Sequence, residues 1–259
     1  MKRLHLLPAL ILFLLISCGK SRSDSKKTAT INQQDIETLL ENQRFQCASL
    51  GGDQCPDGLA RLFIINPIDA NNSALCTGFL TSSNRLVTNH HCLSSLDQCR
   101  NTFIAIHQDG THQVARCQSI IKSLDDGNSL ATKSIDVSIL ELDRHLNIDP
   151  FSLTKNNPLT GSKVSAWVVD HLDLFQARLT ELECRSEGEE FSLEFSRCPA
   201  ISGNSGSPMV NSSGWVVGVL WGSTLDNRFN ESLDLEFRRN LSAFSFATDV
   251  KYFKQYSSP

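Results

Sequence analysis

The chain has 259 residues, of which 40% are hydrophobic and 20% are charged, and its formal net charge is −4. This composition excludes a largely disordered chain, because it can bury the core of one large domain or of two small fused ones. The acidic excess disfavours nucleic-acid binding, so no nucleic-acid partner is expected.

The N-terminus has the features of an export signal. Two basic residues precede an apolar run from Leu6 to Ile16, which is shorter than the roughly 20 residues that a membrane-spanning helix needs. Residues 1–17 are therefore expected to be a signal peptide. Their end, LISC at residues 15–18, resembles the lipobox of bacterial lipoproteins, which implies that Cys18 is diacylated and becomes the first mature residue.

Cysteine parity supports this lipid anchor. The chain has nine cysteines, and lipidation of Cys18 leaves eight, enough for four disulfides in an exported protein. Two acyl chains hold a protein stably at a membrane. Gly19 follows instead of the retention aspartate of inner-membrane lipoproteins, so the expected location is the bacterial cell envelope, at the outer membrane or the periplasmic face. The alternative is a plain secretory signal with an incidental cysteine.

Residues 18–44 are expected to be the lipid anchor and a flexible tether. The stretch from Gly19 to Gln34 is polar and has no periodicity, and DIETLLENQ at residues 35–43 predicts a short helix. Removal of Lys2 and Arg3 with the signal leaves 22 basic residues against 28 acidic ones, so the mature chain is more acidic still.

From Gly58 onward, short runs rich in Val, Ile, Phe, Leu and Thr are separated by turn residues, which is typical of antiparallel all-β structure. Twelve such runs suit two six-stranded β-barrels. We expect a domain over residues 45–259, with the first barrel at about 45–150, the second at about 151–248 and a C-terminal helix at about 249–256. The expected strands are 59–65, 77–81, 85–89, 101–107, 114–121, 135–142, 163–169, 175–182, 191–196, 207–211, 215–221 and 243–247.

Two adjacent histidines precede a cysteine in LVTNHHC, residues 86–92. A hairpin across TSSN would bring Cys76 close to Cys92, and a bridge between them would hold the neighbouring His91 in place, as a general base requires. His90 would point to the opposite face of an extended chain. A zinc site on these residues is the rival reading, but adjacent residues cannot easily converge on one tetrahedral centre, so no metal is expected.

Two other segments could supply partners for His91. SGNSGSP places Ser205 between glycines, which permits a tight turn that exposes the hydroxyl and directs backbone N–H groups to one spot. SIDVSILEL alternates Ile135, Val137 and Ile139 with polar residues, so Asp136 faces away from the apolar set. Each signal is weak alone, because a glycine-serine stretch is usually a loop and a strand aspartate is usually solvated.

Together, TNHHC, DVSILEL and GNSGSP, in the order histidine, aspartate, serine, resemble the three catalytic segments of the chymotrypsin-like serine proteases. The 16-residue spacing from Cys76 to Cys92 matches the histidine-loop disulfide of that family. The resemblance covers about residues 58–221. It implies two antiparallel barrels and an endopeptidase for protein or peptide substrates that needs no cofactor.

Carried onto this chain, the resemblance assigns His91 as general base, Asp136 as its orienting carboxylate and Ser205 as nucleophile. The backbone N–H groups of Gly203 and Ser205 would form the oxyanion hole. Asn204 in place of aspartate and Ser207 in place of glycine make the chain most similar to the bacterial glutamyl-endopeptidase, or V8-like, branch.

Departures from the family pattern bear on activation and specificity. Asn204 carries no charge to bind a newly freed N-terminus, so we expect an active site formed without a propeptide cut. Pro199 replaces the pocket aspartate of trypsin-like members, and Leu220 stands where glutamate-specific relatives carry histidine, which leaves a neutral or apolar pocket. Trp221 and Gly222 remain, so the strand along which substrate pairs is expected to be kept.

The remaining cysteines permit several pairings, because eight cysteines allow 105 connectivities. Cys184 and Cys198 bracket a possible hairpin before the serine loop, and Cys47–Cys55 and Cys99–Cys117 follow by elimination. We therefore expect a lipid-anchored, monomeric serine endopeptidase. The alternative is a catalytically silent binding or adhesion lipoprotein on the same scaffold, since a fold does not fix a function.

Overall fold

The computed structural model describes residues 38, 40–49, 54–66, 73–127, 133–154, 156–173, 175–189, 192–224 and 243–257. The expected signal peptide, Cys18 and most of the tether lie outside this part of the chain. Within it, no helix has the length and apolar character needed to cross a bilayer.

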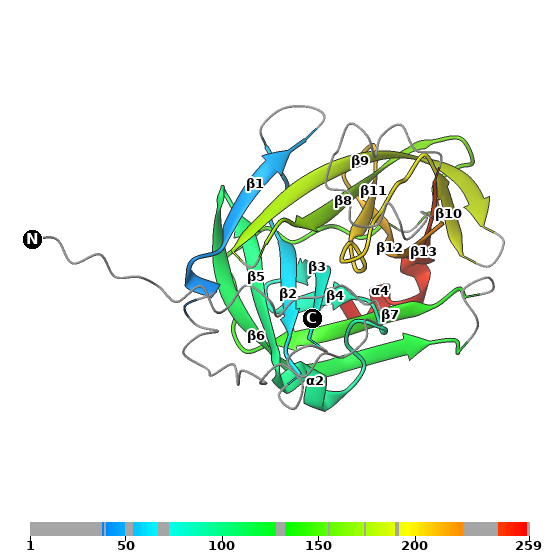
Figure 1. Cartoon of the computed structure of the whole chain (residues 1–259). Coiled ribbons are helices and arrows are strands. Elements are labelled where there is room, and N and C mark those ends of the chain that lie inside the picture. The colour runs from blue at the N-terminus through cyan, green and yellow to red at the C-terminus, as the bar shows by residue number, and fades with distance from the viewer. Residues whose placement is uncertain are drawn as a thin grey trace, which may run out of the picture.

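Six strands close into the first barrel in the order β2-β3-β4-β7-β6-β5, and every neighbouring pair is antiparallel (Figure 1). Its interior is made by apolar residues that alternate along the strands, such as Leu62, Leu80 and Ile104. A five-residue helix, α2 (Leu96–Arg100), begins with a capping box between Ser95 and Gln98. The strands are β2 (Leu59–Ile64), β3 (Ala74–Ser82), β4 (Arg85–Thr88), β5 (Thr102–Gln108), β6 (Thr111–Asp125) and β7 (Asp136–Leu142).

Six further strands form the second barrel in the order β9-β10-β13-β12-β11-β8, and pairing of β8 with β9 closes the ring. All of its neighbouring pairs are antiparallel. The expected architecture of two six-stranded antiparallel barrels is therefore confirmed. The strands are β8 (Lys163–His171), β9 (Gln176–Glu189), β10 (Leu193–Ser196), β11 (Pro208–Asn211), β12 (Val216–Ser223) and β13 (Phe244–Asp249).

The chain ends in short helices, as expected. A 3₁₀ turn, η2 (Val250–Tyr252), is capped by the Asp249 side chain and leads into α4 (Lys254–Ser257). Phe253 between them is fully buried with Val250, so this terminal segment is packed onto the barrels.

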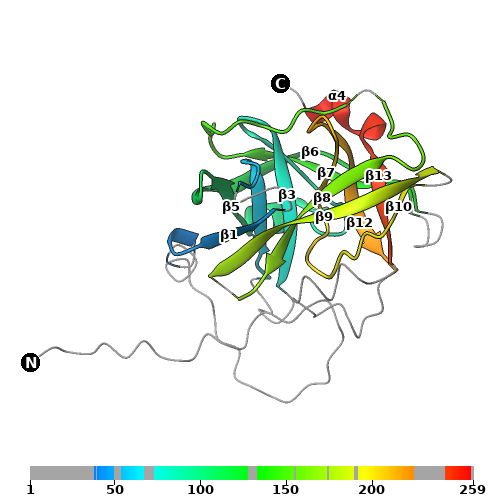
Figure 2. The same ribbon diagram turned by 90° about the horizontal axis from the view of Figure 1, so that it is seen from above.

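One strand was not among those expected. β1 (Arg44–Ala48) precedes the first barrel in sequence but pairs in parallel with β9 of the second barrel (Figures 1 and 2). Its sequence, RFQCA, alternates polar and apolar residues over only four positions, from Arg44 to Cys47, which is too short to indicate a strand by itself. Backbone hydrogen bonds to an available strand edge form it instead.

The two barrels share an apolar interface. It is built from side chains of β3, β4, β7, β12 and the C-terminal segment, among them Phe79, Val87, Ile139 and Val219, all fully buried. Burial of each such side chain contributes roughly 1.5–3 kcal/mol. This interface fixes the relative position of the strand ends that carry His91 and Asp136 on one barrel and Ser205 on the other.

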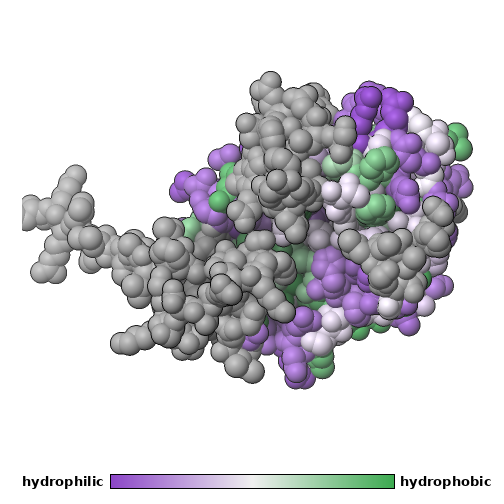
Figure 3. Space-filling view, turned by 45° about the vertical axis from the view of Figure 1, so that its right-hand side comes forward, coloured by the Kyte–Doolittle hydropathy of each residue, from purple (hydrophilic) through white to green (hydrophobic). Residues whose placement is uncertain are grey.

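On the coloured part of the surface in Figure 3, hydrophilic residues predominate and small hydrophobic groups are scattered among them. Few large hydrophobic side chains are exposed, and they belong to different elements, which is ordinary for a folded domain. Those among the described residues are Leu96, Leu159, Phe175, Trp215 and Phe244.

Four disulfides brace the fold, and they are the four pairs that the sequence favoured. They join Cys47 to Cys55, Cys76 to Cys92, Cys99 to Cys117, and Cys184 to Cys198. Several disulfides in one domain are consistent with an exported protein, since they persist in oxidising compartments.

Candidate active site

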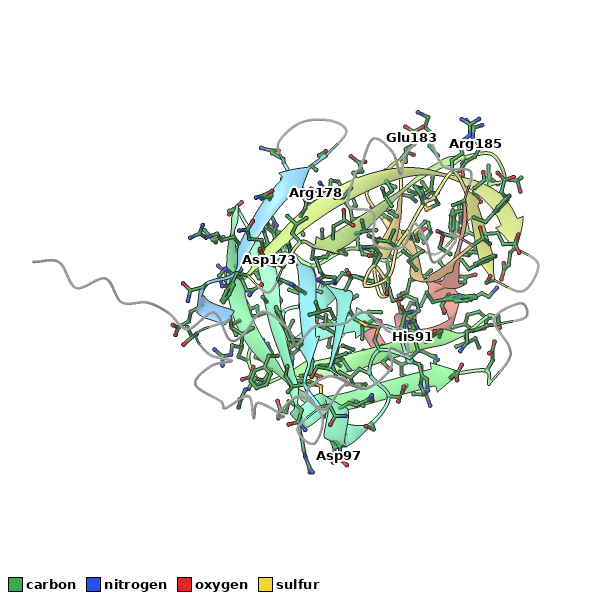
Figure 4. The ribbon with its side chains drawn as sticks, viewed as in Figure 1. His91, Asp97, Asp173, Arg178, Glu183 and Arg185 are labelled. Atoms are coloured by element: carbon green, nitrogen blue, oxygen red, sulfur yellow. A yellow bond between two sulfur atoms is a disulfide. The ribbon has the colours of Figure 1, made fainter. Side chains whose placement is uncertain are left out.

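His91, which is labelled in Figure 4, forms a hydrogen-bonded pair with Asp136. Asp136 is the first residue of β7, and His91 follows the end of β4, which pairs with β7. The distance from His91 Nδ1 to Asp136 Oδ2 is 2.6 Å, and the His91 backbone N–H donates to Asp136 Oδ1 at 3.0 Å. An ionised carboxylate only accepts, so Nδ1 carries the proton and Nε2 keeps its lone pair.

The two side chains differ in exposure, as their chemistry requires. The His91 side chain is 44% exposed and can meet a substrate, whereas that of Asp136 is 2% exposed. Burial is the largest influence on the pKa of Asp136 and would raise it. The hydrogen bond and charge of His91, its backbone N–H and the Lys133 ammonium together outweigh burial, so the pKa of Asp136 is lowered from its usual value. Asp136 is therefore held as an anion.

Neighbouring residues fix the backbone of Asp136. Its N–H donates to Thr248 Oγ1 on the second barrel at 2.9 Å, and its carbonyl accepts from Asn89 Nδ2 at 2.7 Å. Lys133 Nζ lies 3.9 Å from Asp136 Oδ2 and also pairs with Asp125. The contacts of Thr248, Asn89 and Lys133 together hold Asp136 in place.

His90 takes no part in this pair. Its Nδ1 lies 2.8 Å from Ser123 Oγ and its Nε2 lies 3.8 Å from Asp125 Oδ2, on β6. Cys92 is bonded to Cys76, so its sulfur is not available as a thiolate ligand for zinc.

Ser205 lies on the loop between β10 and β11, against the first barrel. Its carbonyl accepts the Thr77 N–H at 2.8 Å. Thr77 adjoins Cys76, and Cys76 is bonded to Cys92, the neighbour of His91. The Cys76–Cys92 disulfide thus connects the residue before Thr77, which binds Ser205, to the residue after His91. Among the described residues, no hydrogen bond joins Ser205 directly to His91. Such a bond is often long without substrate.

Position 206, next to Ser205, requires glycine both because its φ angle is positive and because neighbouring atoms lie too close for a Cβ. Gly206 has φ +93°, and a Cβ there would lie 1.9 Å from Thr77 O and 2.6 Å from Thr88 Oγ1. The Gly206 N–H donates to Leu220 O at 2.9 Å, so the loop is also tied to β12. The serine loop therefore touches both barrels.

The turn before Ser205 leaves two backbone donors unused. Asn204 N–H donates to Ile201 O at 3.0 Å across a turn whose third residue, Gly203, has φ +89°, as in a type II turn. Within the described part of the chain, the N–H groups of Gly203 and Ser205 have no acceptor, while those of Asn204 and Gly206 do. Alternate free donors beside a serine hydroxyl can bind a developing oxyanion.

Asn204 is buried within the second barrel. Its Nδ2 donates to Val169 O at 3.0 Å and to Asp170 Oδ1 at 3.3 Å, and its Oδ1 accepts the Ile201 N–H at 2.9 Å. Asp170 in turn pairs with Arg178 at 3.2 Å. Groups inside the barrel therefore provide hydrogen-bond partners for both polar atoms of the Asn204 side chain, which precedes Ser205.

The residues expected to shape the substrate pocket come from β12 and from the segment before the serine loop. Pro199 is buried before the serine loop, and Leu220 packs in the barrel interior with Ala200 and Ala247. Trp221 is buried and stacks on Phe246, with ring centroids 5.4 Å apart. Gly222, the next residue along β12, is partly exposed and pairs with Phe246.

The sequence reasoning missed several residues around the site: Thr77, Lys133, His171, Thr248 and Arg61. Only Arg61 gave a local signal, as a charged residue inside the apolar run LARLFII. It is fully buried. The others are ordinary polar residues whose partners come from distant parts of the chain.

Comparisons with known proteins agree with this architecture. Residues 76–219, more than half of the chain, match the family model described as trypsin-like peptidase domain. The serine endoprotease from Yersinia pestis is similar in structure, with a TM-score of 0.52 and 15% identity over 76% of this chain and 60% of that chain. A protease from M. tuberculosis in its active form gives a TM-score of 0.49 and 16% identity over 92% of this chain and 90% of that chain. At these identities the structural likeness concerns the fold alone. No curated protein sequence matches the chain.

Proposed function

Because the chain belongs to the trypsin-like peptidase family, we propose that it is an exported, lipid-anchored serine endopeptidase with His91, Asp136 and Ser205 as its catalytic triad. The observation that carries this proposal is the His91–Asp136 pair at 2.6 Å beside a serine loop bonded to Thr77. None of the three roles is filled by a substitute residue.

In the proposed mechanism, His91 Nε2 accepts the Ser205 hydroxyl proton as Oγ attacks the substrate carbonyl carbon. The carbonyl oxygen becomes an oxyanion bound by the N–H groups of Gly203 and Ser205, each worth roughly 3–4 kcal/mol in serine proteases. The tetrahedral species collapses as the C–N bond breaks and His91 returns the proton to the leaving amine. Water then hydrolyses the acyl-enzyme by the same steps in reverse. Asp136 stays ionised and stabilises the imidazolium, in keeping with its lowered pKa.

We propose a neutral or apolar specificity pocket next to Pro199 and Leu220. The apolar neighbours Ala200 and Ala247 support it, because no charge from these residues would attract an acidic or basic side chain. Asn204 and Ser207 support a place in the V8-like branch. The Asn204 side chain already forms hydrogen bonds with Val169, Asp170 and Ile201. These bonds support an active site that needs no propeptide cut, because Asn204 requires no new N-terminus as a partner.

Fluorophosphonate labelling of the full-length protein tests the triad directly. Wild type should be modified at Ser205, and labelling should be lost in Ser205→Ala and reduced in His91→Ala. A Ser202→Ala variant is the matched control, because Ser202 lies on the same loop with its side chain exposed. Folded wild type that resists labelling would favour the silent binding lipoprotein.

Digestion of a diverse peptide library then tests specificity. Cleavage after small or apolar residues is the expected outcome. Dominant cleavage after Glu, Lys or Arg would show that a charged group elsewhere in the chain sets the pocket.

A further inference from the structure

A buried chain of polar groups links the turn before Ser205 to the N-terminal segment, residues 40–49. The His171 Nε2 atom lies 3.1 Å from Gly203 O, and Arg61 Nε donates to His171 Nδ1 at 3.0 Å. Arg61 Nη1 donates to Gln43 Oε1 at 2.8 Å. Gln43 belongs to the N-terminal segment, so three hydrogen bonds connect that segment to the turn.

The protonation of His171 follows from its partners. An arginine Nε–H can only donate, so Nδ1 of His171 must accept, and the ring proton lies on Nε2, which donates to the Gly203 carbonyl. Burial, and then the adjacent Arg61 charge, lower the pKa of His171 to about 3. His171 is therefore neutral over the physiological pH range and fixed in one tautomer.

The Gly203 carbonyl receives a second donor, Thr77 Oγ1, at 2.9 Å. The ring of His171 also packs on Gly203, since a Cβ there would lie 2.6 Å from His171 Cδ2. Two donors and a ring contact thus hold the peptide that follows Gly203. That peptide sets the direction of the free N–H groups on either side of it.

Arg61 is the central member of this hydrogen-bonded series, and its burial has a desolvation cost. It is fully buried, and burial lowers its pKa to about 10. Its acceptors include Gln43 Oε1, the Asp173 carbonyl and His171 Nδ1, and its guanidinium lies 4.7 Å from the Phe63 ring centroid. Figure 4 labels Asp173 beside the end of β9 that lies nearest β1. A buried cation is expensive to desolvate, and a role in positioning would explain why it is kept.

The N-terminal segment is itself attached to both barrels. β1 pairs with β9 of the second barrel, and the Arg44 N–H donates to Phe175 O at 2.7 Å. On the first barrel, His112 Nε2 bonds to Leu40 O at 2.7 Å. The Cys47–Cys55 disulfide ties the segment to the residues that precede β2. Gln43 therefore approaches Arg61 from a fixed position.

We propose that Gln43, Arg61 and His171 act as positioning residues for the oxyanion-binding turn, so that the N-terminal segment completes the active site. This inference rests on the proposed function, because it concerns the rate of the same reaction. The hydrogen bonds of Gln43, Arg61 and His171 would hold Gly203 in place. They would do so without the newly freed, charged N-terminus that binds an aspartate at the position of Asn204 in some members of the family.

The test compares His171→Leu, which has no donor, with His171→Gln, whose amide can accept from Arg61 and donate to Gly203. Since Thr77 still holds the Gly203 carbonyl, His171→Leu should lower kcat by about 10- to 100-fold, less than the removal of a whole oxyanion donor. KM should change little, because the bound substrate carries no oxyanion and the charge develops only on the way to the tetrahedral species. His171→Gln should recover most of the loss.

A second variant tests the N-terminal end without touching the turn. Gln43→Leu should lower kcat by about 3- to 10-fold, and Gln46→Leu, an exposed position on the same segment, should leave kcat unchanged. A peptidyl trifluoromethyl ketone, whose hemiketal oxyanion occupies the same hole, should lose affinity in parallel with kcat. The full-length protein is used throughout, with thermal unfolding measured for each variant.

The outcomes separate this inference from the proposed function. Active wild type with unchanged kcat in His171→Leu overturns the positioning role alone. A loss that His171→Gln does not restore, or that raises KM as much as it lowers kcat, shows a purely structural role and also overturns it. Wild type that is neither labelled at Ser205 nor active overturns both.

Discussion

A single methyl group at Gly206 should separate the serine loop from the first barrel. The Cβ of Gly206→Ala would lie 1.9 Å from Thr77 O, and real Cβ atoms essentially never approach closer than 3.0 Å. The gap must therefore open by about 1.1 Å. That movement breaks the 2.8 Å bond from Thr77 N–H to Ser205 O and shifts Ser205 away from His91.

Two costs set the expected loss of stability. An alanine at φ +93° pays roughly 1–2 kcal/mol of backbone strain, and the lost hydrogen bond adds about 1 kcal/mol. We expect the free energy of unfolding to fall by about 2–3 kcal/mol, which is a fall in Tm of roughly 4–12 °C for a domain of this size. A displacement of about 1 Å between reacting groups costs about 100-fold in rate, so fluorophosphonate labelling should slow by that factor.

Gly214→Ala is the matched control, because Gly214 has φ +79° but no atom within 4 Å of an added Cβ. It should lose about 1–2 kcal/mol of stability through the same backbone strain and label at the wild-type rate. The assay measures labelling rate and thermal unfolding for both variants. If Gly206→Ala labels as fast as Gly214→Ala, the contact between Thr77 and the serine loop does not position the nucleophile.

Three other changes have defined outcomes. Asp136→Asn should lower kcat by about 10⁴-fold, the loss known for serine-protease triads. Because the pKa of Asp136 is lowered in the folded state, its carboxylate also stabilises the wild type above about pH 4, and this contribution is lost as the pH falls further. The free energy of unfolding in urea should therefore depend less on pH between pH 6 and pH 3 in the variant than in the wild type. Replacing Cys76 and Cys92 together by serine should lower the free energy of unfolding by about 2–4 kcal/mol and slow labelling; equal labelling rates would mean that the bridge does not hold His91. Cys18→Ala should move the protein from the detergent phase to the aqueous phase in Triton X-114 partitioning without loss of activity, and unchanged partitioning would refute the lipid anchor.

Local patterns in the sequence indicated most of the fold. All twelve expected strands are present, because hydrophobic alternation and turn residues act over a few residues and show in the sequence itself. The candidate site was also indicated by local signals: His91 beside a cysteine, Asp136 on an alternating strand and Ser205 between glycines. The order of these three segments along the chain, together with the cysteine spacing, linked them to one another.

Some of the fold and of the candidate site gave no such signal. β1 has only a four-residue alternation, and the main-chain pairing with β9 that forms it leaves no pattern in side chains. No local signal indicated that Thr248 would bind the Asp136 N–H from the other barrel.

The sequence by itself indicated the two-barrel architecture and the three candidate catalytic segments, because each rests on spacing or alternation along the chain. Only the tertiary structure decided that Gln43, Arg61 and His171 connect to Gly203, and that Thr77 holds Ser205. These contacts join residues 18 to 128 positions apart. A hydrogen bond between distant polar residues depends on where folding places them, and their identities alone do not encode it.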